Sequence, residues 1–269
     1  MNILDHPGQD PPLVLLHGLT ANAHSFDGLV GAGLRHRTIC VDLRGRGESH
    51  KPETGYSLAD HARDILNLLD GLNLPDVVLG GHSYGALVSI YLAAHHPERV
   101  QKLVLLDIAH EVPGCQQVYR MIRPSVDRLG LSWPNWEEYL QRIRQAPYFA
   151  GWWDPQIESY LRADLTTLPD GSVTSKVPAA AILEVLDRMV DEDWQGMVRS
   201  ISQPALLVHA SEPFGNGDDP ALISSERVKN TLNCLQQGRL IQVAGNHLTM
   251  LYGDAAKVTA QAIEDFLAE

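Results

Sequence analysis

Ser83 lies at the centre of the segment Gly81-His82-Ser83-Tyr84-Gly85, which separates an apolar run from an alanine-containing helical pattern. A serine at a sharp strand-to-helix turn presents its hydroxyl outward, where it can act as a nucleophile. The glycines of the segment leave room for the following helix to approach the strand. We therefore interpret Ser83 as a candidate nucleophile. The alternative is an ordinary turn in which Ser83 caps the helix.

A serine hydroxyl is a weak nucleophile at its ordinary pKa and needs a base within hydrogen-bond reach. The chain has 12 histidines, so residue type alone selects none of them. His247 follows the last apolar run, in Gly245-Asn246-His247. It stands late in the chain, after the candidate nucleophile, which is the position expected of the base at a strand–turn–helix serine of this kind. We predict His247 as the general base. His82 adjoins Ser83, but neighbouring side chains on a strand point to opposite faces, which favours a position behind the turn.

The elements that must position these residues alternate between short apolar runs and longer helical patterns, which is typical of βαβ units and a mainly parallel sheet. Strands are predicted at residues 13–16, 38–41, 77–79, 103–106, 205–208 and 240–243. Helices are predicted at residues 58–72, 86–95, 228–235 and 254–267. Ser57 and Asp60 form a capping box in front of the first helix. The sequence thus predicts an α/β fold with six or seven strands.

The alternation stops near residue 112 and resumes near residue 200. The segment between holds all five tryptophans, several prolines, a helical pattern at 179–189 and no clear strand. We predict a core domain formed by residues 1–111 and 201–269, with a helical cap, or lid, inserted at 112–200. Such a cap would lie over the strand ends, where ligands bind in folds of this kind. Its aromatic residues either line an apolar pocket for an acyl chain or form the cap's own core: Trp133, Trp136, Tyr139, Phe149, Trp152, Trp153 and Tyr160.

Composition narrows the possible partners. The 269 residues, 44% of them hydrophobic, can bury a substantial core, and a formal net charge of −12 argues against a nucleic-acid groove. No apolar run reaches the roughly 18 residues of a membrane span, and residues 1–12 lack the pattern of a signal peptide. The three separated cysteines support neither a disulfide framework nor a metal site and favour a cytoplasmic setting. We expect a monomer or homodimer that acts on a small molecule without nucleic acid, membrane, metal or cofactor.

Four motifs occur in one order along the chain: His17-Gly18-Leu19-Thr20, Asp42-Leu43-Arg44-Gly45-Arg46-Gly47-Glu48-Ser49, the Gly81–Gly85 turn and Gly245-Asn246-His247. Together they resemble the α/β-hydrolase family over almost the whole chain. The resemblance implies a mainly parallel α/β-hydrolase sheet flanked by helices, a catalytic triad, and an oxyanion hole formed by the backbone N–H groups of Leu19 and Tyr84. The implied activity is hydrolysis of a carboxylic ester or lactone through an acyl-enzyme. An N-acyl homoserine or macrolide-like lactone is one possible subtype.

The acid of the triad departs from the usual pattern. The segment after the predicted strand 205–208 is Ala210-Ser211-Glu212-Pro213-Phe214, with proline where the family often has aspartate. Asp107 closes strand 103–106, and some relatives, including certain lactonases and haloalkane dehalogenases, take their acid from that place. We predict that Asp107 accepts a hydrogen bond from Nδ1–H of His247. Three alternatives stay open, namely Glu212, Asp218 and Asp219, and Asp107 could instead be a turn cap.

Other functions remain open beside ester or lactone hydrolysis. The family also contains carbon–carbon bond hydrolases, proline iminopeptidases and cofactor-free haloperoxidases. A serine at position 83 excludes the aspartate nucleophile of dehalogenases and epoxide hydrolases. A hypothesis of another class is a hydrolase-fold receptor that binds a ligand with little turnover.

Overall fold

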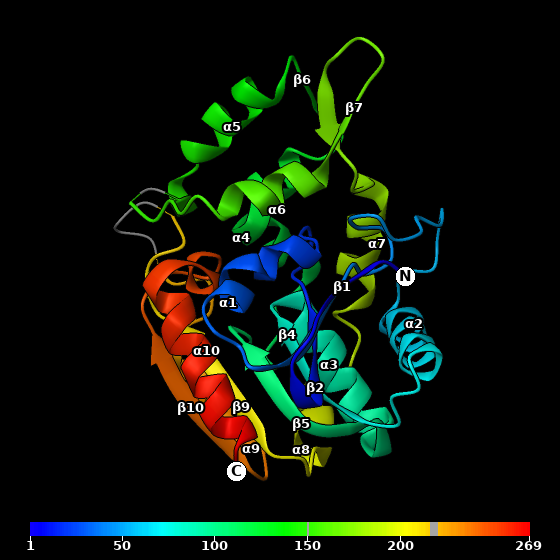
Figure 1. Ribbon diagram of the computed structural model, residues 1–269, viewed down its shortest axis with the longest axis vertical. Coiled ribbons are helices and arrows are strands. Elements are labelled where there is room, and N and C mark those ends of the chain that lie inside the picture. The colour runs from blue at the N-terminus through cyan, green and yellow to red at the C-terminus, as the bar shows by residue number, and fades with distance from the viewer. Residues whose placement is uncertain (150, 216–219) are drawn as a thin grey trace.

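A seven-stranded sheet forms the centre of the computed structural model, which describes residues 1–149, 151–215 and 220–269 (Figure 1). In spatial order the strands are β1 (Ile3–His6), β3 (His36–Val41), β2 (Gln9–Leu16), β4 (Val77–His82), β5 (Val100–Leu106), β9 (Ala205–Ala210) and β10 (Gly238–Val243). Neighbouring strands run parallel, except that β1 is antiparallel to β3. The α/β fold expected from the alternation is therefore confirmed.

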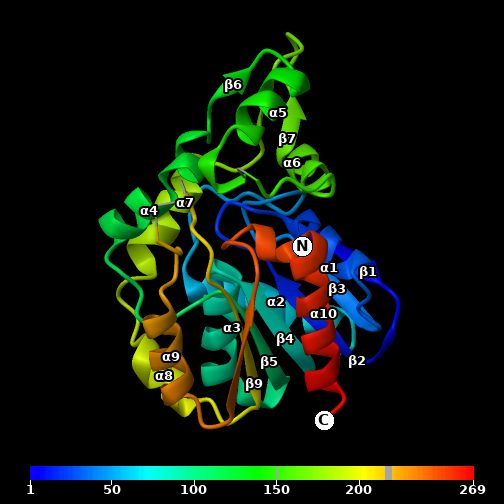
Figure 2. The same ribbon diagram turned by 90° about the vertical axis from the view of Figure 1, so that its left-hand side faces the viewer.

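Helices cover both faces of the sheet (Figure 2). One face carries α1 (Asp27–Gly31) and α10 (Gly253–Leu267), and the other carries α2 (Leu58–Gly71), α3 (Tyr84–His95), α8 (Trp194–Ser200) and α9 (Ser225–Cys234). Strand residues alternate between these layers. In β2, Val14 and Leu16 belong to the core cluster of α2 and α3, while Leu13 and Leu15 belong to that of α10. A parallel sheet is normally buried on both faces, as it is here. The packed sheet holds in place the loops that begin at its carboxyl edge.

The predicted elements of the core are all present, and the capping box of α2 is formed. The Ser57 hydroxyl accepts from the Asp60 N–H, and the Asp60 carboxylate accepts from the Ser57 N–H, both at 3.2 Å. Strand β1 is the difference from the sequence-based expectation. A four-residue strand at the sheet edge offers too few positions for a recognisable alternation.

The inserted residues lie above the carboxyl edge of the sheet (Figures 1 and 2). Before α8 they form α4 (Cys115–Asp127), α5 (Trp136–Arg144), α6 (Ile157–Asp164) and α7 (Ala179–Arg188). They also form an antiparallel sheet of β6 (Ser132–Trp133), β8 (Val173–Ser175) and β7 (Leu165–Thr167), so the expectation of an insertion without strands is wrong. Strands of two or three residues leave no periodic pattern. Helix α8 packs against α3 and α9 of the core, and the cap boundaries at 112 and 200 stay a prediction.

Among the helices that the structure describes, none combines the length and the apolar character needed to cross a bilayer.

Candidate active site

Ser83 lies between β4 and α3 with φ +54° and ψ −118°, a conformation that strains a residue with a Cβ. Its N–H donates a 3.0 Å hydrogen bond to the Leu106 carbonyl of β5. A Cβ at Gly81 would overlap the backbone of Gly85, and a Cβ at Gly85 would overlap the Leu16 carbonyl. The two glycines therefore allow the close approach that the sequence predicted for this strand–turn–helix unit. Strain held by such packing is common where a side chain must be presented for chemistry.

His247 and Asp107 meet across the carboxyl edge, with Nδ1 of His247 2.6 Å from Oδ2 of Asp107. Because a carboxylate oxygen only accepts, this contact assigns the ring hydrogen to Nδ1 and leaves Nε2 as an acceptor. Asp107 directly follows β5, has φ +49° and is 1% exposed. The structure thus brings together the two residues predicted as base and acid and holds the imidazole in the tautomer that can accept a proton.

The second oxygen of Asp107 has its own partners. Oδ1 accepts from the Ala210 N–H at 3.0 Å and from Nδ1 of His209 at 2.9 Å. Burial opposes ionisation, but the hydrogen bonds from His209 and His247 outweigh it and lower the pKa of Asp107 to about 2. The group is therefore a carboxylate at neutral pH and can stabilise an imidazolium at His247. Sequence reasoning missed His209, although a histidine directly after the apolar run of β9 was a signal for it.

None of the alternative acids is seen to contact His247 as Asp107 does within the described residues. The Glu212 N–H bonds the Gly245 carbonyl at 3.2 Å, but its carboxylate makes no hydrogen bond or ion pair with His247 within residues 1–149, 151–215 and 220–269. Asp218 and Asp219 lie outside the described residues. Among the described carboxylates, the geometry favours Asp107.

His82 is closer to the base than its position on the strand suggested. Nε2–H of His82 donates to the backbone carbonyl of His247 at 2.6 Å, and the two rings are 4.6 Å apart. Both rings line the same cavity. Alternation along β4 predicted a place behind the turn, but it could not show that the ring reaches a residue 165 positions later. His82 therefore ties the segment of the base to the turn of the nucleophile.

Leu19 and Tyr84 line the cavity beside Ser83, and within the described residues neither N–H donates a hydrogen bond to the protein. Tyr84 is the first residue of α3, where helix geometry leaves the N–H groups without partners. His17 holds the loop that carries Leu19, because its Nε2 accepts from the Leu43 N–H at 3.0 Å and its Nδ1–H donates to the Gly18 carbonyl at 2.8 Å. Two available N–H groups beside a serine hydroxyl can stabilise an oxyanion.

The cavity is mainly apolar and receives walls from both the core and the insertion. Of the seven aromatic residues considered from the sequence, Phe149 and Tyr160 line it. Trp133 and Trp136 instead pack on Tyr139, with ring centres 5.8 and 6.1 Å away. The remaining two, Trp152 and Trp153, are also outside the lining.

Sequence reasoning missed three aromatic residues of the cavity wall, Tyr148, Phe214 and Tyr252. Tyr148 and Phe214 stack with ring centres 5.4 Å apart, and the Phe214 ring lies 5.7 Å from that of His247, nearly perpendicular to it. They come from segments far apart in the chain, so no local spacing pointed to them. Arg128 and Arg227 are the charged side chains of the described lining, and no described carboxylate lines the cavity.

Buried neutral histidines make this region sensitive to acid. Burial lowers the pKa of His82 to about 3 and that of His17 to about 4. In the unfolded chain the pKa of a histidine is about 6.5, so the unfolded state binds more protons between these values. The contribution of these two histidines to the stability of the folded state is therefore complete above pH 6.5 and is lost as the pH falls from 6.5 toward their folded-state pKa values.

We expect His82→Gln to make the free energy of unfolding less dependent on pH. Between pH 5.5 and 4, wild-type His82 should contribute a loss of about 1.4 kcal/mol for each pH unit of acidification. Glutamine does not titrate, so the variant should lose stability less steeply by that amount. Urea unfolding at pH 5.5, 4.75 and 4 measures the two slopes. Equal slopes would show that His82 is protonated in the folded protein.

The sheet order, the strained serine turn and the inserted helices above the strand ends define an α/β hydrolase. A profile of the alpha/beta hydrolase fold family matches residues 11–212, and the chain belongs to this family.

Individual relatives give the comparison more detail. The chain is 27% identical over 266 residues to 2-(acetamidomethylene)succinate hydrolase of Mesorhizobium japonicum, covering 97% of this chain and 89% of the relative. The crystal structure of an E-2-(acetamidomethylene)succinate hydrolase is similar with a TM-score of 0.84 and 23% identity, covering 99% and 94% of the two chains. The enol-lactonase from Burkholderia xenovorans LB400 has a TM-score of 0.75 and 18% identity, with 99% and 96% covered. The two structural likenesses support the fold.

Proposed function

We propose that this protein is a serine hydrolase that cleaves a carboxylic ester or lactone. Ser83 is the nucleophile, His247 the general base and Asp107 the acid that orients it. One observation carries the proposal. The 2.6 Å contact between Asp107 and His247 lies at a cavity that is also lined by Ser83, which a strained turn presents there.

In the proposed reaction, Oγ of Ser83 attacks the carbonyl carbon while Nε2 of His247 takes the hydroxyl proton. The carbonyl oxygen becomes an oxyanion that accepts hydrogen bonds from the N–H groups of Leu19 and Tyr84. The carbon–oxygen bond to the alcohol then breaks, and His247 gives its proton to the leaving oxygen. Water then attacks the acyl carbon while Nε2 of His247 takes a proton from it; the bond from the acyl carbon to Oγ of Ser83 breaks, His247 returns the proton to Oγ, and the acid is released. In a lactone the alcohol and the acid are parts of one product.

The acyl part of the substrate would lie under residues 112–200, which act as the cap in this proposal. Val118, Ile122, Tyr148 and Phe149 contribute apolar surface from the insertion to the cavity. Apolar walls favour a hydrocarbon chain and strengthen the hydrogen bonds to the oxyanion by excluding water.

A second candidate is hydrolysis of an acetamido compound that carries carboxylates. Arg128 and Arg227 line the cavity, and no carboxylate of the described residues does. Each arginine also has an acidic neighbour. Nη1 of Arg128 lies 2.5 Å from Oδ2 of Asp164, and Nε of Arg227 lies 3.8 Å from Oε2 of Glu111. The relative that matches almost the whole chain is named for an acetamidomethylene succinate. Arginine is well suited to bind such carboxylates.

Labelling with a fluorophosphonate tests the proposal. We expect the folded protein to be phosphonylated at Ser83, as found by peptide mass spectrometry, because the reagent needs an activated serine. A panel of p-nitrophenyl esters and lactones of graded acyl length, with 2-(acetamidomethylene)succinate beside them, then defines the substrate. Turnover of the succinate compound alone would favour the second candidate. Folded protein that does not label would contradict a serine hydrolase and favour a ligand-binding receptor.

A further inference from the structure

Arg46 is buried behind the two residues that we propose as oxyanion donors. It belongs to the loop between β3 and α2, and its side chain is 0% exposed. Nε–H donates to the Leu19 carbonyl at 3.0 Å, and Nη1–H donates to the Arg44 carbonyl at 2.7 Å. Arg46 therefore contacts the loop that follows β2 directly. It does not line the cavity.

The guanidinium of Arg46 has no carboxylate partner within residues 1–149, 151–215 and 220–269, and its Nη2 makes no hydrogen bond there. Its neighbour Arg44, by contrast, pairs with Asp64 at 2.7 Å. Burial lowers the pKa of Arg46 to about 10, so the group remains charged at neutral pH. Burying a charge without a counter-ion destabilises a fold. Violations of this kind are expected at sites that serve function.

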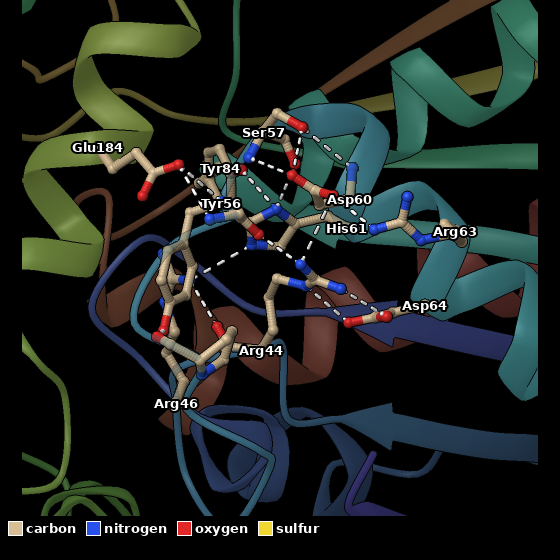
Figure 3. Close-up of polar contacts among 12 residues, drawn as sticks. Arg44, Arg46, Tyr56, Ser57, Asp60, His61, Arg63, Asp64, Tyr84 and Glu184 are labelled. Atoms are coloured by element: carbon tan, nitrogen blue, oxygen red, sulfur yellow. Dashed lines mark hydrogen bonds and ion pairs between the residues drawn. The ribbon is translucent and has the colours of Figure 1, made fainter.

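Aromatic rings surround the guanidinium instead. Its central carbon lies 5.7 Å from the ring centre of Tyr84 and 5.9 Å from that of Tyr56, within the range of cation–π attraction. Figure 3 shows this cluster, in which His61 of α2 lies beside Tyr84. Arg46 thus contacts both Leu19 and Tyr84, which come from different strand ends.

His61 adds a second connection between Arg46 and Tyr84. Nε2 of His61 is 3.3 Å from Nη1 of Arg46, and because a guanidinium only donates, Nε2 is the acceptor. Nδ1–H then donates to the Ser57 carbonyl at 2.8 Å, and the Tyr84 hydroxyl lies 3.2 Å from the same nitrogen. The three side chains form a continuous polar contact that ends at the first residue of α3.

We propose that Arg46 is a positioning residue that fixes the two oxyanion donors relative to each other, Leu19 through its carbonyl and Tyr84 through its ring. This inference rests on the proposed function. Donors that are already in place stabilise the oxyanion without reorganisation during the reaction, which is the main source of their effect on rate. Loss of Arg46 should therefore lower kcat and leave ground-state binding of the substrate nearly unchanged.

The test compares Arg46→Gln, which removes the charge, with Arg46→Lys, which keeps a charge but loses the planar fork. We expect kcat to fall about 100-fold in the glutamine variant, the range for loss of one oxyanion donor, with KM changed less than about twofold. The lysine variant should lose less, about tenfold. Hydrogen exchange of the amides at residues 18–21, in the loop after β2, should rise in the same order while the strands of the central sheet stay protected. Arg44→Gln is the matched control and should change neither measurement.

The two proposals can fail separately. If either folded Arg46 variant keeps wild-type exchange at residues 18–21, the positioning role is wrong, whether or not kcat changes. If the wild type hydrolyses no ester, lactone or amide, the proposed function is wrong, and the exchange measurement still decides whether Arg46 orders the Leu19 loop. If Arg46→Gln does not fold, the lysine variant decides by the same criterion.

Discussion

Ser83→Ala is expected to lower kcat on the best ester or lactone by at least about 10⁴-fold, because removal of Oγ abolishes the covalent route through the acyl-enzyme. The remaining turnover would come from the oxyanion hole and substrate binding alone. Oγ of Ser83 makes no hydrogen bond within the described residues, and alanine has the same backbone strain at φ +54°. We therefore expect the free energy of unfolding to change by less than about 0.5 kcal/mol. Steady-state kinetics and urea unfolding on one preparation separate the two effects.

Ser89→Ala is the matched control for this loss. Ser89 lies on α3, is fully buried and donates from Oγ to the Gly85 carbonyl at 2.9 Å, but it does not line the cavity. Its substitution should change kcat by less than about threefold, since surrounding packing is preserved when one hydroxyl is removed. An active Ser83→Ala enzyme would remove Ser83 from the mechanism.

Asp107→Asn is expected to lower kcat by about 10⁴-fold. The amide that replaces Oδ2 can donate to Nδ1 of His247, which favours the tautomer whose Nε2 carries the hydrogen and cannot accept a proton. The neutral side chain also loses the stabilisation of the imidazolium. Binding of substrate should change little, because Asp107 does not line the cavity. Pre-steady-state kinetics with a p-nitrophenyl ester would place the defect in acylation.

Glu212→Gln provides the comparison, since Glu212 stands where the family often has its acid. We expect a change in kcat of less than about threefold, because within the described residues its carboxylate makes no hydrogen bond or ion pair with His247. The opposite ranking of the two variants would move the acid to the loop after β9. A strong defect at Asp219→Asn with a weak one at Asp107→Asn would have the same meaning.

Local patterns in the sequence were sufficient for the core of the fold. The apolar runs of β2 and β4 and the capping box at Ser57 are signals within a few residues, and the structure contains each element they predicted. The shortest strands, β1 and β6 to β8, were not predictable because two to four residues show no alternation.

The candidate site was only partly accessible from the sequence. Ser83 and His247 stand at element boundaries that can be recognised locally, and family resemblance placed Asp107. The contact of Arg46 with Leu19 and the stacking of Tyr148 on Phe214 join segments that are far apart in the chain. An arginine is almost always exposed, so no composition rule predicts that Arg46 is buried.

The insertion supplies part of the cavity wall but none of the three residues that we propose as nucleophile, base and acid. Ser83, Asp107 and His247 follow strands of the central sheet, whereas Val118, Tyr148 and Phe149 belong to the insertion above them. In the proposed enzyme, changes in substrate preference can therefore accumulate in the insertion while the proton-transfer geometry is conserved. The insertion is therefore the part of the proposed enzyme in which substrate preference could be engineered without touching the residues that transfer protons.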